Sequence, residues 1–136
     1  PIDGVVLLTG CVGVNYQVGT PPESDPNAYA PVEFPKLASG AFVAELDGKL
    51  VSLRCRFNQA FSQDGRSVEG RVSSPEPGAV GMVAVSFHDS LREKAISMKM
   101  GEIVTLRGKV RAVQSTHVLS GKAWTGNYLE TYFIDP

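Results

Sequence analysis

The 136-residue sequence has few of the side chains on which most catalytic and metal centres depend. It contains two cysteines and two histidines, and neither His88 nor His117 has a cysteine or carboxylate at metal-ligand spacing. It also lacks a phosphate-binding loop, a dinucleotide-binding fingerprint and a nucleophile elbow. His88 precedes Asp89, but such a pair is more typical of a strand end that meets a helix cap. We therefore predict a non-enzymatic protein without cofactor or metal; a catalytic site assembled from distant residues is the least favoured alternative.

Long apolar runs and a disulfide framework are also missing. No window approaches the ~20 apolar residues of a membrane span, and two cysteines define no disulfide pattern. The chain is still long enough to bury about two-thirds of its unfolded surface without a crosslink. The net charge is only −1, but residues 1–47 carry −5 and residues 48–136 carry +4. These features predict a single, mildly basic domain with an N-terminal arm.

The N-terminal arm contains a motif that leaves the compartment open. Residues 8–11 read Leu-Thr-Gly-Cys, which resembles a bacterial lipobox in which Cys11 would receive lipid. Asp3 and the absence of a preceding basic residue count against this interpretation, because secretory signals have a basic start and an apolar core. The alternatives are a lipid-anchored protein of the bacterial cell envelope, which contacts the membrane only through Cys11, and a cytoplasmic protein in which Cys11 is a small buried residue. A disulfide between Cys11 and Cys55 would require an oxidising compartment.

A proline-rich segment connects this arm to the rest of the chain. Residues 20–36 contain five prolines and no hydrophobic periodicity. Proline removes a backbone donor and favours extended neighbours, so this segment is a linker or a strap along the surface. In a strap, Tyr29 and Phe34 would be the anchoring residues. Residues 1–36 are thus predicted as arm and linker, and residues 37–136 as the folded domain.

The domain alternates apolar and polar residues over several short segments. Residues 37–47 predict a short helix, and residues 90–98 predict a second helix that starts with a capping box, Ser90 and Glu93. The most regular alternation lies in residues 101–113, with Gly108 on its apolar face, where glycine often marks a bulge or a close backbone approach. Five strands are predicted: residues 50–58, 66–73, 82–88, 101–113 and 128–134.

Three strands, a capped helix and two further strands follow the order of an OB-fold, a five-stranded Greek-key barrel. Residues 100–110, MGEIVTLRGKV, resemble the fourth-strand pattern of nucleic-acid-binding OB domains. Residues 47–53 with their preceding helix are similar to the bacterial tRNA-anticodon-like OB proteins. Cys55 departs from the pattern, which often has glycine there. The resemblance covers about residues 49–136 and implies an all-β fold, an OB barrel with a helix between strands three and four.

The resemblance also implies a binding groove over the second and third strands, beside two loops. Basic residues occupy the outward strand positions 54, 56, 71, 107, 109 and 111, with Glu69 and Glu130 among them. Arginines and loop aromatics suit single-stranded nucleic acid or another anionic oligomer. An ordinary solvated sheet face is the alternative, as is an envelope lipoprotein whose barrel contacts a protein. The loops would contribute Phe61, Arg66, His117, Lys122 and Trp124. The predicted ligand-binding residues are Arg54, Arg56, Phe61, Arg66, Arg71, Lys122 and Trp124.

Overall fold

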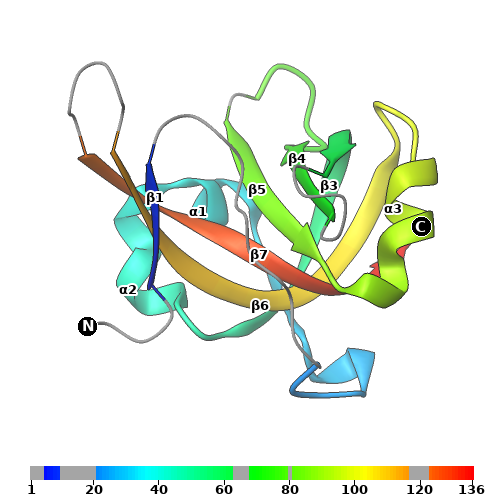
Figure 1. Ribbon diagram of the computed structural model, residues 1–136, viewed down its shortest axis with the longest axis horizontal. Helices are drawn as coiled ribbons and strands as arrows, with labels where there is room; N and C mark the ends of the chain where they lie inside the picture. The colour runs from blue at the N-terminus through cyan, green and yellow to red at the C-terminus, as the bar shows by residue number, and fades with distance from the viewer. Residues whose placement is uncertain (1–4, 10–20, 63–67, 80, 117–122) are drawn as a thin grey trace.

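The computed structural model describes residues 5–9, 21–62, 68–79, 81–116 and 123–136, and it describes side chains for 21–62, 68–79, 81–112 and 126–136 (Figure 1). Five strands close into a barrel in the order β3–β4–β5–β7–β6–β3, in which only the β5–β7 pair is parallel. The five strands are β3 (Leu50–Phe61), β4 (Val68–Ser73), β5 (Met82–Phe87), β6 (Ile103–Thr116) and β7 (Ala123–Asp135).

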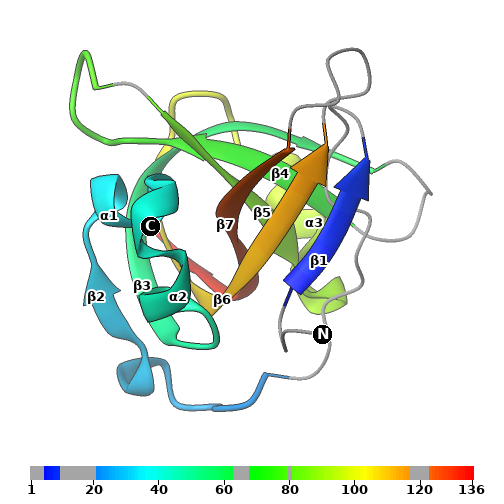
Figure 2. The same ribbon diagram turned by 90° about the vertical axis from the view of Figure 1, so that its left-hand side faces the viewer.

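Two short strands from the N-terminal arm extend this sheet. β1 (Val5–Thr9) runs parallel to the end of β6, and β2 (Ala30–Val32) runs parallel to the start of β3 (Figure 2). Between them, η1 (Pro26–Ala28) is a single turn. Tyr29 is buried, donates its hydroxyl hydrogen to the carbonyl of Glu23 at 2.7 Å and packs edge-on against Phe133. Residues 21–36 therefore form the strap, and both expected anchors, Tyr29 and Phe34, are buried.

Apolar alternation places one side of every barrel strand in a common core, as predicted. Each barrel strand contributes a residue with no exposed surface, because successive side chains of a strand point to opposite sides. Cys55 is also fully buried, and burial raises the pKa of its thiol to about 12. It is therefore an inert core thiol. One such residue from each barrel strand is Leu53, Val72, Val85, Leu106 and Leu129.

Short helices close the two ends of the barrel (Figure 1). At one end lie α1 (Phe34–Ala38), η2 (Gly40–Phe42) and α2 (Val43–Leu46), and the buried residues of α1 and α2 join the core. At the other end lie η3 (Asp89–Leu91) and α3 (Arg92–Ser97), with Ala95 fully buried. Among the described residues, no helix has the length and apolar character needed to cross a membrane.

Both helix predictions were wrong at their boundaries. The single helix expected over residues 37–47 is divided at Ser39, which has an extended backbone and accepts a hydrogen bond from the Ala41 amide. The expected capping box at Ser90 is replaced by His88, whose Nδ1 accepts from the Ser90 amide at 3.2 Å. In each place one side chain, the hydroxyl of Ser39 or the imidazole of His88, accepts a hydrogen bond from an amide of the 3-10 turn that precedes the α-helix.

Gly108 lies at a close approach of β6 and β7. The register of the two strands shifts between Arg107 and Gly108. A Cβ atom at Gly108 would overlap the carbonyl oxygen of Glu130 and would lie 3.0 Å from Cα of Thr131. The predicted bulge and close approach at this glycine are therefore confirmed. β6 and β7 also continue further than expected, so their connection shortens from residues 114–127 to residues 117–122.

Candidate functional site

The predicted ligand-binding residues are spread over several elements. Arg54, Arg56 and Phe61 belong to β3, and Arg71 belongs to β4. Trp124 pairs with Ser115 through the backbone of β7, and its side chain lies outside the described part of the chain. The remaining predicted residues also lie outside the described residues, so their roles stay predictions: Cys11, Arg66, His117 and Lys122.

Arg71 and Phe61 come together at the end of the β3–β4 hairpin. The guanidinium carbon of Arg71 lies 5.7 Å from the centre of the Phe61 ring, a cation–π arrangement. The Nη1 atom of Arg71 is buried and has no hydrogen-bond acceptor among the described residues. An aromatic face and a guanidinium with unused hydrogen-bonding capacity are thus combined at one place.

Arg56, by contrast, is used to hold the structure together. Its Nη1 donates to the carbonyl of Gly101 at 3.1 Å, and its Nη2 donates to the carbonyl of Pro75 at 3.2 Å. The side chain therefore connects the turn before β6 to the segment after β4. Because both outer nitrogens already have acceptors, Arg56 has less capacity for a ligand than Arg71.

Most of the other outward cations are also paired or partly buried. Arg107 forms an ion pair with Asp135, and Nε of Arg111 lies 3.6 Å from Oε1 of Glu130. Lys109 is half-buried. Among the predicted residues whose side chains the structure describes, Arg54 is the exposed one, and it forms no ion pair or hydrogen bond with a described residue.

A row of polar residues on the outward side of the barrel is buried, which sequence reasoning missed. Glu69, Ser86 and Glu130 are in register across β4, β5 and β7, with exposed fractions of 1%, 0% and 3%. Tyr132 donates its hydroxyl hydrogen to Oε2 of Glu130 at 3.0 Å. Both glutamates lie on the outward side as expected, but the alternative of an ordinary solvated sheet face does not hold for them. No signal in the sequence distinguished them from solvated residues, because alternation reports the side of a strand and not its contacts.

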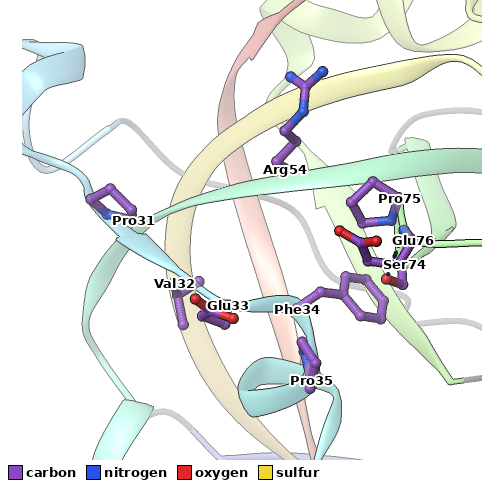
Figure 3. A pocket seen from close by; sticks show the side chains of 9 residues that line it. All are labelled: Pro31, Val32, Glu33, Phe34, Pro35, Arg54, Ser74, Pro75 and Glu76. Carbon is purple, nitrogen blue, oxygen red and sulfur yellow. Dashed lines mark hydrogen bonds between the residues drawn. The ribbon is translucent and has the colours of Figure 1, made fainter. Parts of the chain in front are cut away.

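A cleft of about 270 Å³ lies beside Arg54 (Figure 3). One wall is formed by residues 31–35 of β2 and α1, and the other by residues 74–76 after β4. Figure 3 shows the ring of Phe34 directed from the first wall toward Ser74, and two carboxylates, Glu33 and Glu76, belong to opposite walls. Within the described part of the chain, no group of three or more histidine, cysteine or acidic residues could hold a metal ion.

No protein-family model and no curated protein matches the sequence. Solved structures do match. The asparaginyl-tRNA synthetase of Pyrococcus horikoshii aligns with a TM-score of 0.53 and 17% identity over 76% of this chain and 22% of the synthetase. The mitochondrial single-stranded DNA binding protein of S. cerevisiae aligns with a TM-score of 0.51 and 12% identity, over 65% of this chain and 94% of that protein.

The small single-stranded DNA-binding protein of Streptomyces coelicolor gives a similar result, with a TM-score of 0.50 and 14% identity over 65% of this chain and 93% of that one. These similarities agree with the closed five-stranded barrel and its strand order. The domain is an OB-fold. The predicted fold class is thereby confirmed, whereas identities below 20% transfer no ligand, because one fold supports many functions.

Proposed function

We propose that this OB-fold domain is a non-enzymatic binding module for single-stranded nucleic acid or another anionic oligomer. The proposal rests on the placement of Arg71 over Phe61 at the end of the β3–β4 hairpin. It draws further support from two similar structures that are named as single-stranded DNA-binding proteins and that this barrel covers almost completely.

The pair at positions 61 and 71 supplies both interactions that such a ligand needs. An aromatic ring stacks on any base, and each stacked base contributes about 1–3 kcal/mol to binding. A guanidinium binds phosphate oxygens through charge-assisted hydrogen bonds.

The test is fluorescence anisotropy of a labelled single-stranded oligonucleotide at several salt concentrations, with Arg71→Gln and Phe61→Leu. Loss of one stacked base is expected to weaken binding by about 5- to 160-fold for Phe61→Leu. Loss of one phosphate contact is expected to lower the salt slope of Arg71→Gln by about 0.7. Lys49→Gln is the matched control, because Lys49 is exposed and lies at the opposite end of β3, beside α2.

Wild-type affinity and salt slope in both hairpin variants would refute this site. Binding that is equally strong for heparin or polyphosphate would identify the ligand as an anionic oligomer without bases. The intrinsic fluorescence of Trp124, the single tryptophan, offers an independent readout. A saturable change that weakens with salt supports the proposal, and no binding of any anionic oligomer at physiological salt overturns it.

A further inference from the structure

The cleft beside Arg54 has walls that are fixed before any ligand arrives. Phe34 anchors the wall of β2 and α1, because its side chain is buried in the barrel core. Arg56 anchors the opposite wall through its hydrogen bond to the carbonyl of Pro75. Ser74 stiffens the same wall, since its hydroxyl oxygen accepts a hydrogen bond from the Glu76 amide at 3.1 Å. Such a preformed cleft needs little reorganisation to bind a ligand.

The cleft offers many acceptors and few donors. Pro31, Pro35 and Pro75 line it and have no backbone N–H. The ionised carboxylates of Glu33 and Glu76 only accept hydrogen bonds. The side chains that can donate there are the Arg54 guanidinium, which Figure 3 shows directed away from Phe34, and the hydroxyl of Ser74. The cleft therefore suits a ligand that carries hydrogen-bond donors.

The two carboxylates have no partner among the described residues. Glu33 occupies the N-cap position of α1, but its side chain makes no capping hydrogen bond. Neither Glu33 nor Glu76 forms a side-chain hydrogen bond or an ion pair with the described part of the chain. Arg54, which could pair with either, pairs with neither. With Glu33, Glu76 and Arg54, the residues that line the cleft carry a net charge of −1.

We propose that this cleft binds one lysine or arginine side chain of a protein partner. The aliphatic stem would lie on the prolines and Val32, and the cationic head would lie between Glu33 and Glu76. At about 270 Å³, the cleft is smaller than typical small-molecule sites of ~300–1,000 Å³, which favours a single inserted side chain. A polyanion is disfavoured, because it would face two carboxylates. The proposal goes beyond nucleic-acid binding at the hairpin and does not depend on it.

Replacing Arg54 is expected to change the affinity for a cationic ligand and for a nucleic acid in opposite directions. A cationic ligand is repelled by Arg54, so Arg54→Gln should strengthen its binding. A phosphate-bearing ligand is attracted by Arg54, so the same substitution should weaken its binding. One variant therefore separates the two classes of ligand.

The experiment is an NMR titration of ¹⁵N-labelled protein with acetyl-Gly-Arg-Gly-amide, and with the same peptide carrying neutral citrulline in place of arginine. Amide shifts of residues 32–34 and 74–76 are expected with the arginine peptide and not with the citrulline peptide. Glu33→Gln and Glu76→Gln should each weaken binding by about 1.5- to 5-fold, the range of one exposed ion pair. Glu93→Gln on α3, at the other end of the barrel, is the matched control and should leave binding unchanged.

Three results would overturn the proposal. Equal shifts with the citrulline peptide would show that the charge is not recognised. Weaker binding of the arginine peptide in Arg54→Gln would contradict the expected repulsion. Shifts of residues 74–76 by an oligonucleotide, lost in Arg54→Gln, would assign the cleft to nucleic acid. The hairpin proposal is tested separately by Arg71→Gln, so failure of one does not imply failure of the other.

Discussion

Gly108→Ala tests the geometry on which the barrel closes. A methyl group at this position would overlap the carbonyl oxygen of Glu130 and would lie 2.8 Å from its carbonyl carbon. These are backbone atoms of the paired strand β7, so no side-chain rotation can relieve the overlap. Either β6 and β7 separate locally and lose ladder hydrogen bonds, or the bulge at Arg107 and Gly108 rearranges.

The expected cost of Gly108→Ala can be set against the stability of the whole domain. Overpacking by one methyl group costs about 1–3 kcal/mol where side chains can yield. Because the obstacle here is backbone, we expect about 3 kcal/mol or more. Domains are stable by about 5–15 kcal/mol, so a large part of the total would be lost. The melting temperature should fall by about 10 °C.

Urea unfolding followed by circular dichroism measures this free energy directly. Gly78→Ala is the control, because a Cβ at Gly78 meets nothing within 4 Å and only the positive φ of 79° opposes it. That strain costs roughly 1–2 kcal/mol. A Gly108→Ala variant no less stable than Gly78→Ala would refute the close approach of β6 and β7.

Three further predictions concern Arg56, Tyr29 and Cys55. Arg56→Ala should destabilise the domain by about 2 kcal/mol in urea unfolding, because it removes two charge-assisted hydrogen bonds to Gly101 and Pro75. Tyr29→Phe should cost about 0.5–1.5 kcal/mol in the same assay, because the hydrogen bond to Glu23 is lost. In a Cys11→Ser background, Cys55 should resist iodoacetamide until the domain unfolds, and labelling of the native protein would contradict its burial. The pKa of Cys55 rises from 9.0 to about 12, so its contribution to stability should be complete below about pH 9 and decline between about pH 9 and 12.

The strand pattern could be predicted because burial in a barrel follows the period of a strand. Val51, Leu53, Cys55 and Phe57 of β3 are all buried, as the alternation predicts. Gly108 was also informative, because a glycine inside a strand removes the side chain that would obstruct a neighbouring backbone. The order of strands and helix then restricts the topology to few alternatives.

The boundaries of the helical segments were harder to predict from the sequence, because the α-helices are only four to six residues long. In such segments, local capping decides the boundaries and a hydrophobic period has no room to develop. Ser39 ends one helix and starts a turn, and His88 caps a turn that a sequence pattern assigns to Ser90. Tertiary contacts then fix the result, since Phe34 and Leu37 are drawn into the barrel core.

The candidate site was still harder to predict. The alternation of apolar and polar residues identifies the side of a strand on which a residue lies, but it does not show whether that residue is exposed to water. Arg54 and Arg56 are two positions apart on the same side of β3, yet one is exposed without a described partner and the other holds two carbonyls. Their charge and spacing are the same, so the difference arises from segments distant in sequence. A mutation that reverses both charges together would therefore mix a binding effect with a stability effect. Arg71→Gln and Arg54→Gln, taken singly, avoid this, because neither side chain makes a hydrogen bond to the described backbone.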